Sequence, residues 1–369
     1  MPTYLANQTL KTFSELVAID SPSRHEENIR QDLIQRLEAL GIAVETDATG
    51  NLLGRMGASK GYEHLCAVLI NCHMDTVPNA VQAKIVVKDG YVYSDGTTAL
   101  GADDKAGIAA TITALTTMHK EHLPHGPIVV LFTVAEEVGL EGIKSFDTLK
   151  LGPIGRGYTL DAGAPVGTAI VRAPSKSEAT IVFHGKAAHA GAAPENGISA
   201  ISLAARAIDK MRLLRVDDET TANIGTIQGG TVNNIVCDRC EISLEVRSAS
   251  NEQVHAHLAH IEFCCIKAIN DFGGSYDFQT RDSYPSYALD KNAPQLLAFK
   301  AVCATLQIPY LSRPSGGGSD ANILQNRGVP VIALGIGYEG AHTLHESIAI
   351  QELDTITRLL IALCGPQED

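Results

Sequence analysis

Apolar residues recur along the chain with two different periods. A spacing of three to four residues, which is typical of amphipathic helices, covers the first forty residues and several later segments. Nearly unbroken apolar runs, such as 65–71 and 128–134, are typical of strands covered on both faces of a parallel sheet. The pattern predicts helices at 5–18, 26–40, 105–120 and 350–364, hairpins at 42–56 and 84–94, and buried strands at 65–71, 128–134, 157–160 and 330–335.

The middle of the chain has a different order of elements. Strand, helix, strand, strand, helix, strand is the order of the split β-α-β, ferredoxin-like arrangement. We therefore expect an α/β domain with a mostly parallel, mixed sheet flanked by helices, formed by residues 1–174 and 290–369. An α+β domain of residues 175–289 is inserted into it. The inserted strands are predicted at 177–184, 223–228, 234–246 and 276–280, and its helices at 198–214 and 252–269.

The charge and composition of the chain limit the classes of partner that it is expected to bind. A net charge of −13 without a Lys/Arg stripe argues against nucleic acid and acidic membranes. The start of the chain lacks a signal-peptide pattern, and no apolar run approaches transmembrane length, so we expect a cytoplasmic protein. The eight cysteines lie mostly in apolar runs, which favours buried thiols over disulfides. Cys237 and Cys240 have CxxC spacing, but Cys240 alternates with apolar residues on one face of a predicted strand, so we do not expect a redox or zinc role for this pair.

Acidic and imidazole side chains follow three of the predicted buried strands. His73 comes after the first, Glu136 and Glu137 after the second, and Asp161 at the end of the third. Ligands of open α/β sheets bind outside the carboxyl ends of the strands, where these side chains converge. Imidazole nitrogen and carboxylate oxygen are the ligands of catalytic zinc, so the pattern predicts metal-dependent hydrolysis. Each group alone is more often an ordinary hydrogen-bonded or solvated residue, and the convergence carries the prediction.

Two adjacent acids, Asp103 and Asp104, stand where a predicted helix begins. A helix cap explains one of them, whereas two exceed what a cap requires, and Asp103 fits a bridge between two ions. In an extended segment, residues two apart face the same side, so Asp75 is expected to accept the second ring N–H of His73. Adjacent glutamates should point to opposite sides, which would separate a ligand from a general base.

Six ordered motifs resemble those of the dinuclear zinc peptidases related to carboxypeptidase G, aminoacylase and peptidase T. The resemblance runs nearly from end to end and includes an inserted lid domain. Segments 95–105 and 317–322 make the peptidase T-like branch the nearest. The six motifs are His73-Met74-Asp75, 101–107, Glu136-Glu137, Asp161, 185–191 and 340–346.

The resemblance implies a set of metal ligands. It places two Zn²⁺ ions in each chain, with Co²⁺ or Mn²⁺ as alternatives. His73 and Asp161 would hold one ion, Glu137 and His342 the other, and Asp103 would bridge both. It also implies a cis peptide bond between Asp103 and the next residue.

Further roles follow from the same resemblance. Glu136 would be the general base that deprotonates the metal-held water, and Asp75 would orient the first histidine. His342 is preferred over His345 as a ligand, because relatives place the ligand four residues before a glutamate, here Glu346.

The inserted domain is expected to act as a lid and to form a homodimer. By resemblance, His189 polarises the substrate carbonyl, and Asn234 and Arg247 grip the substrate. These residues lie in a different domain from the ligands, so productive binding would need the two domains to close.

We therefore expect a metallo-exopeptidase that removes the N-terminal residue of short peptides. An N-acyl amino acid amidohydrolase or a carboxypeptidase with the same chemistry remains an alternative, as does a catalytically inactive binding module. Peptidase T has a motif similar to Arg-Gly-Gly-Thr-Asp at the position where this chain has Ser315-Gly-Gly-Gly-Ser-Asp320. The arginine of that motif is therefore absent from this chain. Substrate length, side-chain preference and the physiological metal are left open.

Overall fold

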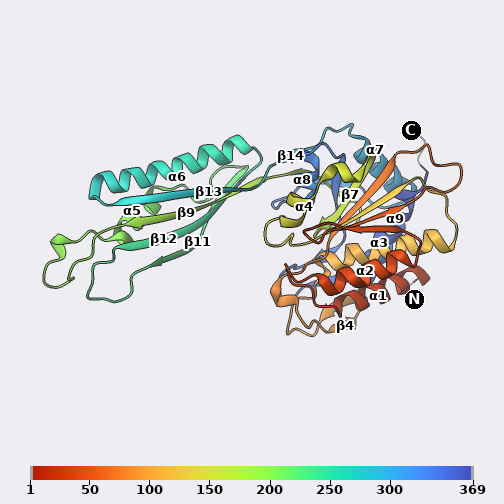
Figure 1. Cartoon of the computed structure of the whole chain (residues 1–369), viewed down its shortest axis with the longest axis horizontal. Coiled ribbons are helices and arrows are strands. Elements are labelled where there is room, and N and C mark those ends of the chain that lie inside the picture. The colour runs from red at the N-terminus through yellow and green to blue at the C-terminus, as the bar shows by residue number, and fades with distance from the viewer. Residues whose placement is uncertain (1–2, 367–369) are drawn as a thin grey trace. The chain divides into compact units, whose positions relative to one another are not determined.

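The computed structural model describes residues 3–366, and the chain divides into two compact units. Unit 1 comprises the described residues up to Arg172, Ala288–Ser315, and the described residues from Ser319 onward. Unit 2 comprises Ala173–Tyr287 and Gly316–Gly318. The two ends of the chain therefore build one unit, and the middle of the chain builds the other (Figure 1).

Unit 1 is organised by a mixed sheet of nine strands in the order β1-β2-β6-β3-β7-β16-β8-β14, with β15 beside β8. The central strands β6, β3, β7 and β16 are parallel neighbours, and β2 and β8 flank them in the antiparallel sense. The predicted mixed α/β fold is confirmed. The strands are β1 (Ala43–Thr46), β2 (Leu52–Met56), β3 (Ala67–His73), β6 (Ile128–Thr133), β7 (Ile154–Ala162), β8 (Thr168–Ala173), β14 (Tyr287–Ala288), β15 (Leu311–Pro314) and β16 (Val331–Gly335).

Helices flank this sheet, as the apolar periodicity predicts. Three of them, α1, α3 and α9, pack against one another and share one apolar core with the sheet. A smaller sheet has the order β17-β18-β5-β4. The remaining elements are α1 (Tyr4–Val17), α2 (Glu27–Glu38), α3 (Ala102–Lys120), α4 (Glu141–Ser145), α7 (Pro294–Thr305), α8 (Asp320–Asn326), α9 (Ile350–Cys364), β4 (Ile85–Lys88), β5 (Tyr91–Ser94), β17 (Tyr338–Glu339), β18 (Ser347–Ala349), and the 3-10 turns Pro78–Ala80 and Thr148–Leu151.

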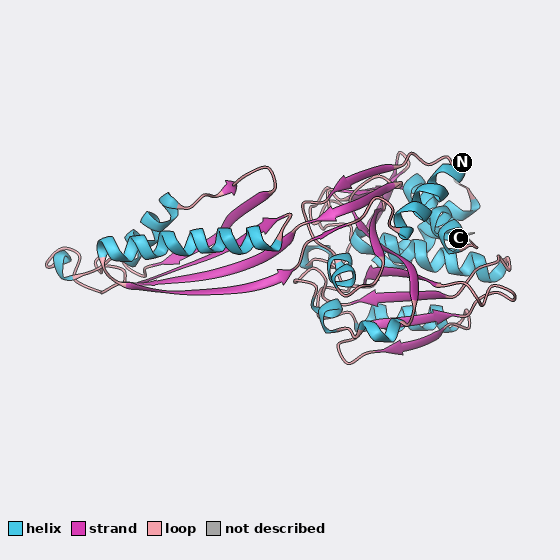
Figure 2. Ribbon diagram, turned by 90° about the horizontal axis from the view of Figure 1, so that it is seen from above, coloured by secondary structure: helices cyan, strands magenta, loops and turns pink. Residues whose placement is uncertain are grey.

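Unit 2 has the ferredoxin-like order of elements and a second apolar core. Its antiparallel sheet has the order β10-β11-β12-β9-β13. Buried residues alternate along β9 and β12, because α5 and α6 cover one face of this sheet (Figure 2). The elements are β9 (Ser175–His184), α5 (Ala200–Lys210), β10 (Leu214–Arg215), β11 (Thr220–Gly229), β12 (Arg239–Ser248), α6 (Asn251–Phe272), β13 (Ser275–Tyr284) and the 3-10 turn Pro194–Asn196.

One predicted strand begins later than expected. The strand predicted at 234–246 starts at Arg239, because the preceding backbone bonds to another loop. The carbonyl of Asn234 accepts the N–H of Ala190 at 3.0 Å, and that of Cys237 accepts the N–H of Ala200 at 2.7 Å. The elements β8, β15, α4, α7 and α8 were not predicted. All eight cysteines are free thiols, as expected.

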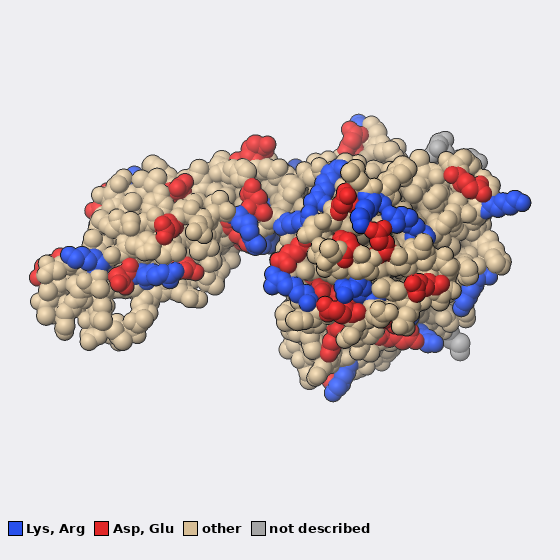
Figure 3. Space-filling model, in the orientation of Figure 1, with Lys and Arg blue, Asp and Glu red and all other residues tan. Residues whose placement is uncertain are grey.

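The surface carries charges of both signs. On the face drawn in Figure 3, Lys and Arg side chains are interspersed with Asp and Glu side chains. Among the described residues, every helix is too short or too polar to span a lipid bilayer.

The buried strand β3 contributes to the apolar core of unit 1. Leu69 on this strand is fully buried, so Leu69→Ala should lower the free energy of unfolding by about 2–5 kcal/mol. Leu149 is 87% exposed, and Leu149→Ala should change the free energy of unfolding by less than about 0.5 kcal/mol. Equal losses in a denaturant titration of the two variants would contradict this packing.

Candidate metal centre

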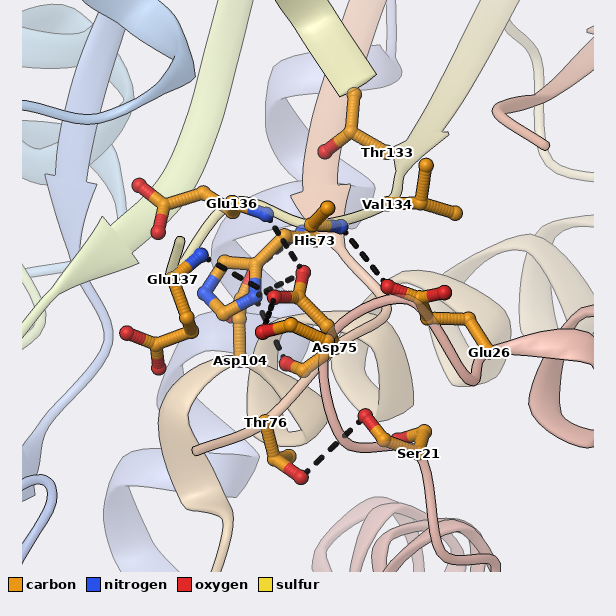
Figure 4. Close-up of polar contacts among 12 residues, drawn as sticks. Ser21, Glu26, His73, Asp75, Thr76, Asp104, Thr133, Val134, Glu136 and Glu137 are labelled. Carbon is orange, nitrogen blue, oxygen red and sulfur yellow. Dashed lines mark hydrogen bonds and ion pairs between the residues drawn. The ribbon is translucent and has the colours of Figure 1, made fainter. Parts of the chain in front are cut away.

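Three parallel strands deliver side chains to one edge of the main sheet. His73 is the last residue of β3, Asp161 is the penultimate residue of β7, and Glu136 and Glu137 lie in the loop that follows β6. Because β3 pairs in parallel with both β6 and β7, these strand ends lie side by side. Figure 4 shows the side chains of Glu136 and Glu137 diverging from adjacent backbone positions near His73.

Asp103 lies between two imidazole rings. Its Oδ1 is 3.0 Å from Nε2 of His73, and its Oδ2 is 3.4 Å from Nε2 of His342. The His73 ring is also 3.7 Å from Oδ1 of Asp161, and the His342 ring is 3.0 Å from Oε1 of Glu137. The structure thus forms two groups, His73–Asp103–Asp161 and Asp103–Glu137–His342, in which the potential ligand atoms lie within 4.8 Å of one another. The two groups share the carboxylate of Asp103.

The donor set fits a pair of divalent cations. Nitrogen and carboxylate oxygen ligands suit zinc, cobalt and manganese. The side chains of Asp103, Glu137 and Asp161 are only 11%, 9% and 10% exposed. Several carboxylates buried so close together are unfavourable unless protons or cations balance their charge. His345, the alternative ligand, is exposed and belongs to neither group.

The backbone that carries Asp103 is held by Glu346. The Glu346 carboxylate is 1% exposed and accepts the N–H of Gly101 at 2.8 Å and the N–H of Asp103 at 3.1 Å. Gly101 has φ +75°, and the peptide bond between Asp103 and Asp104 is cis, as predicted. In the sequence, Glu346 served only to identify His342 as the ligand four residues before a glutamate. Its role as an acceptor of backbone N–H groups was not predicted.

Asp75 contacts both His73 and the loop of the two glutamates. The Nδ1 atom of His73 is 2.9 Å from the backbone carbonyl of Asp75 and 3.5 Å from its carboxylate. The carboxylate itself accepts the N–H of Glu136 at 2.9 Å and the N–H of Glu137 at 3.1 Å (Figure 4). It also accepts the hydroxyl of Ser23 at 2.7 Å. The sequence predicted that the side chain of Asp75 accepts the second ring N–H of His73, but the nearer acceptor is the backbone carbonyl of Asp75. The contact with the loop was not foreseen.

The charges of the centre shift one another's pKa values. Burial opposes ionisation of Asp103, but hydrogen bonds with both imidazoles outweigh it and lower the pKa of Asp103. Burial and the charge of Asp103 raise the pKa of Asp161 to about 7. Burial and neighbouring carboxylates raise the pKa of Glu136 well above its usual range. Contacts with Asp103 and Glu137 raise the pKa of His342 to about 10.

A buried polar network beneath the centre was also missed. The Oδ2 atom of Asp320 accepts hydrogen bonds from Asn71 at 3.1 Å and Thr133 at 2.5 Å, and Asn71 in turn accepts one from Thr159 at 2.9 Å. Asp320 ends the Gly-rich segment 315–320 and is the first residue of α8. The sequence feature that could have revealed this network is the presence of polar residues at positions 71, 133 and 159, within otherwise apolar strands.

The predicted substrate residues lie in unit 2. The Nδ1 atom of His189 accepts the N–H groups of Gly191 at 3.2 Å and Ala192 at 3.1 Å, so the neutral ring carries its proton on Nε2. Asn234 bonds to the His189 loop through its carbonyl. Arg247 forms an ion pair with Glu245 at 2.9 Å and donates to the carbonyl of Gly316 at 3.2 Å.

A match to a family of peptidases identifies the chain as a hydrolase. Residues 69–364 match the model of peptidase family M20/M25/M40, and the chain belongs to this family. The chain is a peptidase T-like member of it, as the sequence motifs indicated.

Three relatives cover almost the whole chain. An uncharacterized protein, YqjE, from Bacillus subtilis (strain 168) is 39% identical over 359 residues, 96% of each chain. The aminopeptidase PepT from Bacillus cereus is 38% identical with a TM-score of 0.89, over 97% of this chain and 98% of that one. A tripeptidase from Staphylococcus aureus is 36% identical with a TM-score of 0.93, over 99% and 98%.

The raised pKa of Asp161 predicts a pH effect on the metal-free protein. A carboxyl whose pKa rises from 3.8 to about 7 on folding stabilises the folded state fully only below about pH 4. This contribution is lost as the pH rises toward about 7. With a chelator present, the Tm of the wild type should therefore fall more steeply over this range than that of Asp161→Asn. Parallel profiles would show that Asp161 does not titrate in this way.

Proposed function

We propose that this peptidase is a metal-dependent aminopeptidase that removes the N-terminal residue of short peptides. The observation that carries the proposal is the carboxylate of Asp103, which lies between His73 and His342 and joins two potential ligand groups. The similarity to an aminopeptidase and a tripeptidase over nearly the full chain supports the choice of substrate.

Two Zn²⁺ ions would bind to the two ligand groups. His73 and Asp161 would hold one ion, Glu137 and His342 the other, and Asp103 both. When bound, such a pair polarises a peptide carbonyl and lowers the pKa of a water molecule. The charge of the ions would also offset the repulsion among the buried carboxylates.

Glu136 is the proposed general base. It is adjacent to a proposed ligand but belongs to neither ligand group, so its carboxylate is left for proton transfer. Glu136 would accept a proton from the attacking water and deliver it to the leaving amine nitrogen. Burial and neighbouring carboxylates raise the pKa of Glu136 in the metal-free protein. Bound cations would oppose this rise and favour the ionised carboxylate that a general base requires.

Unit 2 would provide contacts to the peptide. The Nε2–H of His189 is a suitable donor to a substrate carbonyl, because Nδ1 is already occupied by two backbone donors. Asn234 and Arg247 are the other proposed substrate contacts. We also propose that unit 2 forms the interface of a homodimer.

A hydrolysis panel tests the proposed function directly. Free-amine tripeptides, free-amine dipeptides and N-acetyl amino acids would be offered to the Zn²⁺-loaded protein, with product identified by mass spectrometry. Release of the N-terminal residue from tripeptides is the expected result. Preferential deacylation of N-acetyl amino acids, or release of C-terminal residues, would replace the proposal with an amidohydrolase or a carboxypeptidase.

The two adjacent glutamates should respond differently to the same substitution. Glu136→Gln should retain the metal content of the wild type and lower kcat by about 10²- to 10⁴-fold, because general-base catalysis is lost. Glu137→Gln, the matched control, should lose metal, because it removes a proposed ligand. Metal analysis and kinetics of both variants check this, and equal metal loss in the two would remove Glu136 from the role of base.

A further inference from the structure

The N–H groups of the loop that carries Glu136 and Glu137 bond to side chains, whereas its carbonyls accept the backbone N–H groups of residues 139–142. Four consecutive N–H groups of residues 134–137 donate to three side chains that come from distant parts of the chain. The acceptors are Asn51 Oδ1 for Val134 at 3.1 Å, Glu26 Oε1 for Ala135 at 2.9 Å, Asp75 Oδ1 for Glu136 at 2.9 Å and Asp75 Oδ2 for Glu137 at 3.1 Å.

Ala135 is the point at which this loop needs support. Its φ is +51°, in the left-handed region that residues other than glycine rarely adopt. The residue is 3% exposed, so its N–H has little access to water. The contact with Glu26 therefore satisfies a buried donor at the strained residue that directly precedes Glu136.

Glu26 is buried, and a second backbone N–H group holds its carboxylate in position. Its side chain is 3% exposed, and the same Oε1 atom accepts the N–H of Arg24 at 2.8 Å. Arg24 in turn forms a two-pronged ion pair with Glu141 at 3.0 and 2.7 Å, just beyond the loop. The segment before α2 thus contacts the loop and the helix that follows it.

Glu26 approaches the loop away from the metal ligands. It lines a cavity of about 360 Å³ together with Glu27, Arg30, Val134 and Ala135. None of the five proposed ligands lines this cavity. Glu26 therefore contacts the centre through the loop, and it contacts none of the proposed ligands within this cavity.

We propose that Glu26 is a positioning residue for Glu136. By accepting the N–H of Ala135, it fixes the backbone turn from which the general base projects. This inference rests on the proposed function, and its essential property is a hydrogen-bond acceptor at Oε1 rather than a negative charge.

Substitutions at Glu26 separate the acceptor from the charge. Glu26→Gln keeps an oxygen acceptor and should retain kcat within about threefold. Glu26→Ala should lower kcat by about 10- to 100-fold with little change in KM, because a small displacement of a catalytic group is costly. Glu26→Asp keeps the charge but shortens the side chain, and it should also lower kcat. Glu27→Ala, which removes an exposed carboxylate from the same cavity, should match the wild type.

Hydrogen exchange provides a readout that does not depend on activity. In peptides covering residues 128–140, amide exchange by mass spectrometry should be faster in Glu26→Ala and Glu26→Asp than in the wild type and Glu26→Gln. A loss of kcat in Glu26→Gln equal to that in Glu26→Ala would overturn the proposal, as would unchanged exchange in Glu26→Ala and Glu26→Asp. If the wild type fails to hydrolyse peptides, the proposed function fails, while the exchange data still decide whether Glu26 holds the loop.

Discussion

Repulsion among buried carboxylates is the constraint on which the rest of the centre depends. Asp103, Glu136, Glu137 and Asp161 gather at one edge of the main sheet, and two imidazoles stand among them. Like charges at such distances favour protonation or cation binding. The opposite pKa shifts of Asp103 and Asp161 are consequences of this arrangement, because the imidazoles contact Asp103 more closely.

Side chains outside the centre keep these groups in place. Glu346 holds the backbone of Asp103, while Asp75 and Glu26 hold the loop of the two glutamates. In all three cases a buried carboxylate accepts backbone N–H groups. Such bonds place the proposed ligands and base without adding another mobile side chain to the centre. The positions of the reacting groups therefore depend on acids that would not touch the substrate.

The sequence predicted the elements that depend on local patterns and missed those that depend on distant partners. The apolar runs of β3 and β6 and the order of elements in unit 2 identified the mixed α/β fold with its inserted domain. The start of β12 was wrong, because the backbone of Asn234 and Cys237 bonds to a loop some forty residues earlier. Convergence of side chains at the sheet edge followed from parallel strand ends. The contacts of Glu346 and Glu26 span 243 and 109 residues, and no periodicity signals such a pairing.

The discontinuous course of unit 1 has a consequence for biosynthesis. During translation β3, β6 and β7 emerge early, whereas β16, the parallel neighbour of β7, emerges only after residue 330. Unit 2, which is nearly continuous in sequence, can fold in the interval, while one edge of β7 awaits its partner. His342 and Glu346 come later still, so the candidate centre is completed only after unit 2 and β16 have been synthesised. A nascent chain therefore carries no assembled candidate centre until the residues that follow unit 2 have left the ribosome.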